Sequence, residues 1–180
     1  MPGGFAQTPI VLDRTTGRYR AGAAPVRVQD VLVDTGVSVA GRRIAADDRK
    51  GLVLLRVDGP LRAAYVTAGI YGDAWAGRTS SYRRFDCTGG SLTVTLQSDD
   101  KLFDRVQVVR AFAGGRAVGV ARVAPGKLAT LRVPLVREAA GSCTVRFETA
   151  YTRVPARVQP GAADRRALGI RILGFEVSDR

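Results

Sequence analysis

Histidine is absent from this chain of 180 residues. Because histidine is the commonest general base and the commonest transition-metal ligand, its absence excludes Ser–His and Cys–His catalytic pairs and most metal sites. Glutamate is also scarce, occurring only at Glu138, Glu148 and Glu176. The aspartates show no spacing that is typical of a catalytic pair or of a calcium loop. The composition therefore offers an enzyme little chemistry.

Lysine is nearly absent as well, although the net charge is +12. Only Lys50, Lys101 and Lys127 occur, and the remaining positive charge comes from arginines scattered singly or in pairs. There is no basic tail and no aromatic-interleaved basic motif, which argues against a dedicated nucleic-acid partner. The charge still favours anionic partners such as anionic lipid head groups and phosphorylated or acidic glycans.

Long apolar runs are missing too. The run GLVLL at 51–55 is far shorter than the roughly 18 residues that cross a bilayer. The start, MPGGFAQTP, has neither the basic nor the apolar region of a signal peptide. These features predict either a cytoplasmic protein or a piece of a longer exported or membrane chain.

Alternation of apolar and polar residues is the pattern that dominates the chain, and it is typical of half-buried strands. The segments with a strand-like pattern are 26–33, 37–44, 52–57, 91–97, 105–112, 116–123, 128–133, 143–151 and 170–177. No stretch carries a convincing helical stripe, and Gly114–Gly115 predicts a two-residue hairpin turn. We therefore expect an all-β fold, an antiparallel β-sandwich of jelly-roll type with eight to ten strands. It would form a single domain over 9–180 after a flexible segment, 1–8.

The regular alternation weakens between Gly59 and Ser81. We interpret this part as a long surface connection, and a long connection inside a compact β domain is often functional. The chain has two cysteines, Cys87 and Cys143. They are either buried free thiols or a bridge that would stabilise the fold by roughly 4 kcal/mol in the chain-entropy model.

Several motifs occur in an order that resembles a known family. They are LLRVDGPLR (54–62), GIYGDAWAG (69–77), YRRFDCTGGSLTVTLQSD (82–99), CTVRF (143–147), PARVQPG (155–161) and DRRALGIR (164–171). Together they resemble the C-terminal extracytoplasmic domain of actinobacterial multi-membrane-span glycosyltransferases. These are enzymes that use polyprenyl-phosphate sugars, including relatives of the mycobacterial arabinosyltransferases. The resemblance covers most of residues 50–177.

The resemblance implies a non-catalytic module similar to a carbohydrate-binding module, since the catalytic carboxylates of such proteins lie in the membrane-embedded half. It implies a disulfide between Cys87 and Cys143, an oxidising compartment and an extracytoplasmic location at the cell envelope. The implied partners are a cell-wall glycan of arabinan, galactan or mannan type, a membrane glycosyltransferase region, or anionic lipid head groups. No membrane half is present in this sequence, so a piece, a split subunit and a free-standing relative are all open.

The stretch GIYGDAWAGRTSSYRRFDC at 69–87 is the candidate glycan site. Saccharides bind to aromatic faces through their C–H groups and to carboxylates or guanidinium groups through their hydroxyls. The predicted carbohydrate-binding residues are Tyr71, Asp73, Trp75, Arg78, Tyr82 and Asp86. The alternative is structural: Trp75 would anchor the core and Tyr82 would be an ordinary strand position.

Other interpretations stay open. Asp164 could cap a turn and pair with Arg165 or Arg166. An enzyme would need an aspartate pair, for instance Asp73 with Asp86, and an assembly domain would bind no glycan. We expect no cofactor. Structural calcium is a further alternative, with oxygen ligands from the pairs at 47–48 or 99–100.

Overall fold

The structure, a computed structural model, describes residues 9–34 and 38–179. Its chain falls into two units, Met1–Val66 and Thr67–Arg180, where the sequence predicts one domain over 9–180. The segment 1–8, expected to be flexible, lies outside the described residues. Across the part of the chain that is described, no helix is long and apolar enough to cross a membrane.

In the first unit, the described residues form two three-stranded antiparallel sheets. One has the order β1-β2-β3 and the other β4-β6-β5. Their strands are β1 (Ile10–Asp13), β2 (Arg18–Ala21), β3 (Ala24–Pro25), β4 (Asp30–Asp34), β5 (Arg42–Asp47) and β6 (Leu52–Arg56). The strands at 26–33 and 37–44 were predicted several residues too early, and position 37 lies outside the described residues. The three strands β1–β3 were not predicted, because two to four residues are too few to show a period.

The second unit is built on one antiparallel sheet of eight strands, whose β7 begins two residues before the boundary between the units. The order is β11-β10-β13-β8-β14-β9-β12, with β7 also paired to β8. The strands are β7 (Tyr65–Ile70), β8 (Trp75–Arg84), β9 (Ser91–Gln97), β10 (Gln107–Ala113), β11 (Arg116–Val123), β12 (Leu128–Pro134), β13 (Cys143–Thr149) and β14 (Ile170–Ser178).

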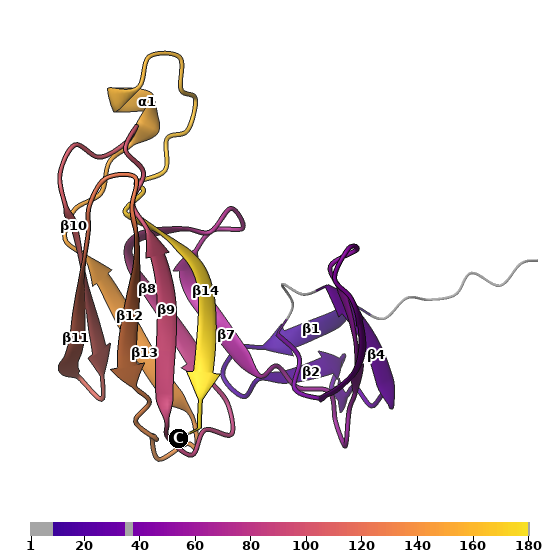
Figure 1. Ribbon diagram of the computed structural model, residues 1–180. Helices are drawn as coiled ribbons and strands as arrows, with labels where there is room; N and C mark the ends of the chain where they lie inside the picture. Colours follow the sequence, from indigo (N-terminus) through magenta and orange to yellow (C-terminus); the bar gives the residue numbers. More distant parts are fainter. Residues whose placement is uncertain (1–8, 35–37, 180) are drawn as a thin grey trace, which may run out of the picture. The chain divides into compact units, whose positions relative to one another are not determined.

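The sheet curls until β11 and β12, its two ends, lie next to each other. Only two residue pairs join β8 to β14, so the sheet bends there into two layers, β11-β10-β13-β8 and β14-β9-β12 (Figure 1). The predicted all-β antiparallel sandwich is confirmed. The described residues hold fourteen strands, more than the eight to ten expected.

The core of this unit lies between the two layers. Burial alternates residue by residue along β9, β10 and β13, as the sequence pattern predicts. The largest fully buried side chains include Tyr82 and Phe147, and both pack against Phe175. The turn at Gly114–Gly115 has φ of 56° and 77°, so the predicted hairpin between β10 and β11 is confirmed. The short helix α1 (Pro155–Val158) lies at the end where β13 ends and β14 begins (Figure 1).

The disulfide between Cys87 and Cys143 is present, with 5.6 Å between the two Cα atoms. Cys143 is the first residue of β13 and pairs in register with Arg84, the last residue of β8. The bridge therefore joins the start of β13 to the chain that has just left β8. Both cysteines are buried.

Candidate functional site

The hairpin between β7 and β8 positions three of the predicted site residues. Ala74 N–H donates to the Tyr71 carbonyl over 3.0 Å, and Tyr71 N–H donates to the Trp75 carbonyl over 2.7 Å. The long irregular connection predicted over 59–81 is therefore wrong, since most of it is paired strand. Glycine, alanine and serine are frequent in β7 and β8, and such small residues hide the alternation that reveals other strands.

Arg166 lies at the centre of the candidate site. Its guanidinium donates to both carboxylate oxygens of Asp73, over 3.0 and 2.6 Å. It also donates to Asp164, over 3.0 and 2.7 Å, and its centre lies 4.6 Å from the Tyr71 ring centroid. The two carboxylates thus hold the planar guanidinium in a fixed orientation above an aromatic ring.

A hollow of about 280 Å³ opens beside this cluster. Its polar or aromatic lining comes from Asp73, Trp75, Asp99, Gln159, Asp164 and Arg166. Apolar groups, including Leu102 and Leu168, complete the wall. The hollow lies at the α1 end of the sandwich, and its volume is close to the lower limit of roughly 300 Å³ for ligand pockets.

Local hydrogen bonds keep the wall in place. Asp99 accepts the backbone N–H groups of Lys101 and Leu102, over 2.8 and 3.1 Å. Gln159, just after α1, donates its side-chain amide to the Lys101 carbonyl over 2.9 Å. Asp164 accepts the Arg166 N–H over 2.9 Å, so the turn cap expected at Asp164 is present.

Trp75 is half-buried and has two environments. It packs against the apolar residues Leu102, Phe103 and Leu168, with 6.4 Å between its ring centroid and that of Phe103. It also lines the hollow, as Leu102 and Leu168 do. The single tryptophan is therefore a core anchor and an available aromatic surface at once, whereas the sequence set these two roles against each other.

The two aspartates that bind Arg166 are held in their charged form. Hydrogen bonds from the guanidinium lower the pKa of Asp73 and also that of Asp164, where the Arg166 backbone N–H adds to the effect. The same contacts raise the pKa of Arg166, with the Asp164 bonds as the largest cause. The cluster carries two negative charges and one positive charge near neutral pH.

The structure does not bring the other predicted site residues to this hollow. Arg78 lines a different hollow. Tyr82 is 1% exposed and packs on Phe175 in the core. Asp86 lies beyond the far end of β8, and that strand is ten residues long, which corresponds to roughly 30 Å. Asp73 and Asp86 therefore cannot act as a pair across one scissile bond.

The sequence offers the aspartate pairs at 47–48 and 99–100 as calcium ligands. In residues 9–34 and 38–179, no group of three or more His, Cys, Asp or Glu side chains is arranged to hold a metal ion. Asp47 accepts the backbone N–H groups of Arg49 and Lys50, and Asp99 caps its own turn.

Sequence reasoning identified Asp164 and Arg166 only as parts of a turn. It missed their contact with Asp73, which lies 93 residues before Arg166. Gln159 was missed as well, since a lone glutamine carries no motif. A scan against protein-family models and a search of curated proteins find no match for this chain.

Proposed function

We propose that this chain is a non-catalytic glycan-binding domain, which holds or orients a cell-wall polysaccharide of arabinan, galactan or mannan type. The observation that carries the proposal is that Trp75 and the cluster of Asp73, Arg166 and Asp164 line one hollow. An aromatic surface beside fixed hydrogen-bonding groups is what a sugar ring requires. The sequence resemblance over 50–177 supports the same function and an extracytoplasmic location, with which the disulfide is compatible.

The hydrogen-bonding capacity of the cluster is not exhausted by Arg166. Each carboxylate oxygen has two lone pairs, so Asp73 and Asp164 can each accept a sugar hydroxyl while they hold the guanidinium. Because the carboxylates are already fixed by Arg166, binding costs little further side-chain entropy. The cluster therefore forms a preorganised set of acceptors.

The lowered pKa of Asp73 and of Asp164 favours binding over glycan cleavage. A glycosidase of the usual kind needs one carboxylic acid that keeps its proton at the working pH. Arg166 stabilises the charged form of both groups and so opposes that protonation. This argument favours the binding domain over the alternative of an aspartate-pair enzyme.

The test is a titration of the full chain with arabinan, galactan and mannan oligosaccharides. Trp75 is the only tryptophan, so a ligand in the hollow is expected to quench or shift the intrinsic fluorescence. Calorimetry on the same samples gives the affinity. If none of the three glycans changes the fluorescence or releases heat, the proposal is wrong.

Two variants locate the binding site. Trp75→Phe keeps an aromatic ring on the core but offers a smaller face, and Tyr71→Ala removes the ring beneath Arg166. We expect Trp75→Phe to weaken glycan binding by reducing the aromatic surface that lines the hollow, and Tyr71→Ala to weaken it by removing the ring that supports Arg166. Each loss should be up to roughly tenfold, since aromatic contacts contribute about 0.5–1.5 kcal/mol. Val120→Ala, which trims a side chain that is 58% exposed on β11, is the control and should bind like the parent. Equal losses in all three would contradict a site at this hollow.

A further inference from the structure

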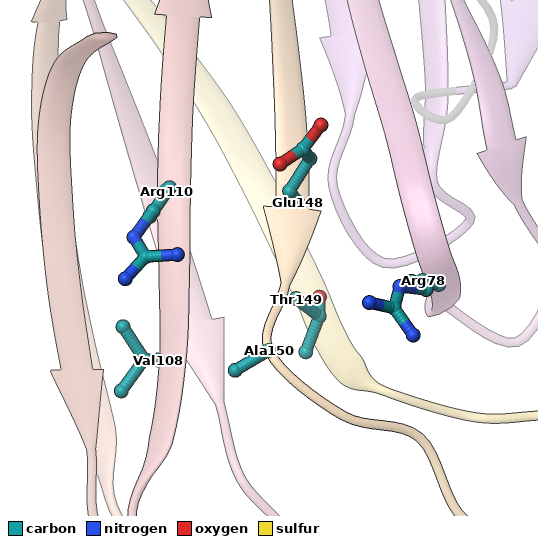
Figure 2. Close-up of a pocket in the computed structure, with 6 residues that line it drawn as sticks. All are labelled: Arg78, Val108, Arg110, Glu148, Thr149 and Ala150. Carbon is teal, nitrogen blue, oxygen red and sulfur yellow. The ribbon is translucent and has the colours of Figure 1, made fainter.

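A second hollow, of about 140 Å³, lies on the layer formed by β8, β10 and β13. It is lined by Arg78, Val108, Arg110, Glu148, Thr149 and Ala150 (Figure 2). It shares no lining residue with the hollow beside Trp75. The proposed glycan site does not account for it.

The floor of this hollow is rigid. Arg110 on β10 pairs in register with Glu148 on β13, and the Ala150 N–H donates to the Val108 carbonyl over 2.9 Å. Thr149 is 4% exposed. The side chains that rise from this floor therefore start from backbone positions that two strands fix.

The charges in the hollow do not balance. The carboxylate of Glu148 forms its ion pair with Arg146 on the same strand. In the part of the chain that the structure describes, neither Arg78 nor Arg110 has an ion pair or a side-chain hydrogen bond. Figure 2 shows their guanidinium groups on either side of Thr149 and Ala150, with the Glu148 carboxylate pointing away from these two residues.

We infer that the hollow between Arg78 and Arg110 binds a phosphoryl group. Both guanidinium groups line this hollow, and an anion bound there is attracted by the two positive charges. A phosphoryl group suits the site better than a carboxylate, because its tetrahedral oxygens point in several directions and can meet two guanidinium forks at once. The phosphoryl group comes either from a soluble phosphate ester or from a phospholipid head group.

The experiment measures two ligands at constant ionic strength. Inorganic phosphate is titrated into the full chain by calorimetry, and vesicles of phosphatidylglycerol or of phosphatidylcholine are tested by co-sedimentation. The variant Arg78→Gln/Arg110→Gln should lower the affinity at least tenfold, because hydrogen bonds between charged groups carry that much or more. Arg78→Lys/Arg110→Lys keeps both positive charges but lacks the planar guanidinium groups, so it should retain only part of the affinity.

A charge-matched control separates a site from general attraction to a basic protein. Arg49→Gln/Arg116→Gln removes two exposed arginines outside the hollow and should bind like the parent. If free phosphate binds through the two arginines and the vesicles do not bind, the natural ligand is a soluble phosphate ester. If phosphatidylglycerol vesicles bind and free phosphate does not, the natural ligand is a phospholipid head group. If neither ligand binds, or if the glutamine pair and its control lose affinity equally, the inference is overturned.

Discussion

Arg166 joins three parts of the chain that are far apart in sequence. It binds Asp164 in its own turn and Asp73 in the β7–β8 hairpin, and it lies over Tyr71. The side chains of Arg166, Asp73 and Asp164 are 29% to 49% exposed. Solvent therefore screens each ion pair, and a single pair stabilises the fold only modestly. The main effect of Arg166 is therefore to fix the geometry of the hollow.

The ion pairs of Arg166 predict a pH dependence with a definite sign. The folded-state pKa of Asp73 and of Asp164 lies below the ordinary value of 3.8. A carboxyl group with a lowered pKa stabilises the fold above its unfolded pKa, and this stabilisation is lost as the pH falls through the folded pKa. We expect Arg166→Gln to lower the melting temperature at pH 6 and to differ less from the parent below about pH 3.

Melting curves of both proteins between pH 7 and pH 2.5 give this comparison. Arg165→Gln removes the same charge from the neighbouring position and serves as the control. A difference between Arg166→Gln and the parent that stays constant over the whole range would show that these carboxylates do not depend on Arg166.

Elements were predicted best where one face is buried. The pattern predicts β9 and β11 with their observed ends. Burial alternates along all seven residues of β9 and along the last four residues of β11. β7 escaped prediction because it consists mainly of small or half-exposed residues. The candidate site depends on that same hairpin and on Arg166, so its residues could be predicted only in part. The aromatic and acidic content of the sequence indicates Tyr71, Asp73 and Trp75. It does not indicate Arg166, which binds Asp73 from 93 residues away.

Gly69 is the glycine that the β7–β8 hairpin requires. Its φ is +70°, and an added Cβ would lie 2.3 Å from the Thr79 carbonyl oxygen. Gly72 has open space around it and does not have a positive φ. We expect Gly69→Ala to lower the free energy of unfolding by about 2 kcal/mol or more, measured by urea denaturation. Gly72→Ala is the matched control, and equal effects of the two substitutions would contradict this explanation.

The disulfide joins the start of β13 to the chain that follows β8. Unfolded, unreduced protein made under oxidising conditions should show no titratable thiol. The variant Cys87→Ala/Cys143→Ala should lose roughly 4 kcal/mol of unfolding free energy, because its unfolded chain regains the entropy of the open loop. Urea denaturation of the parent, with and without reductant, provides an independent measurement. Two titratable thiols, or unchanged stability on reduction, would contradict the prediction.

At the scale of the whole molecule, burial is concentrated in the second unit. Among the described residues, the first unit contributes Leu55, Val57, Leu61 and Ala63 to the buried apolar side chains, and the others belong to the second unit. Along β5 every residue is exposed. The net charge of +12 comes from exposed arginines in both units. It therefore raises the rate at which anionic ligands associate with the protein and has little influence on which fold the chain adopts.

This uneven burial predicts that the second unit folds without the first. A fragment of residues 65–180 keeps β7 whole, and it retains the disulfide, the eight-stranded sheet and both hollows. Strands β9, β10 and β13 bury alternate residues along their whole length, which is the burial that an independent domain needs. We expect calorimetry of the full chain to show a cooperative transition that the fragment reproduces within a few degrees.

The residues before 65 have a small buried core, so they should melt at a lower temperature or without a sharp transition. If the fragment fails to fold while the full chain melts in one transition, the two units depend on each other for stability. Glycan and phosphate titrations of the fragment then show whether each hollow binds its ligand without the first unit.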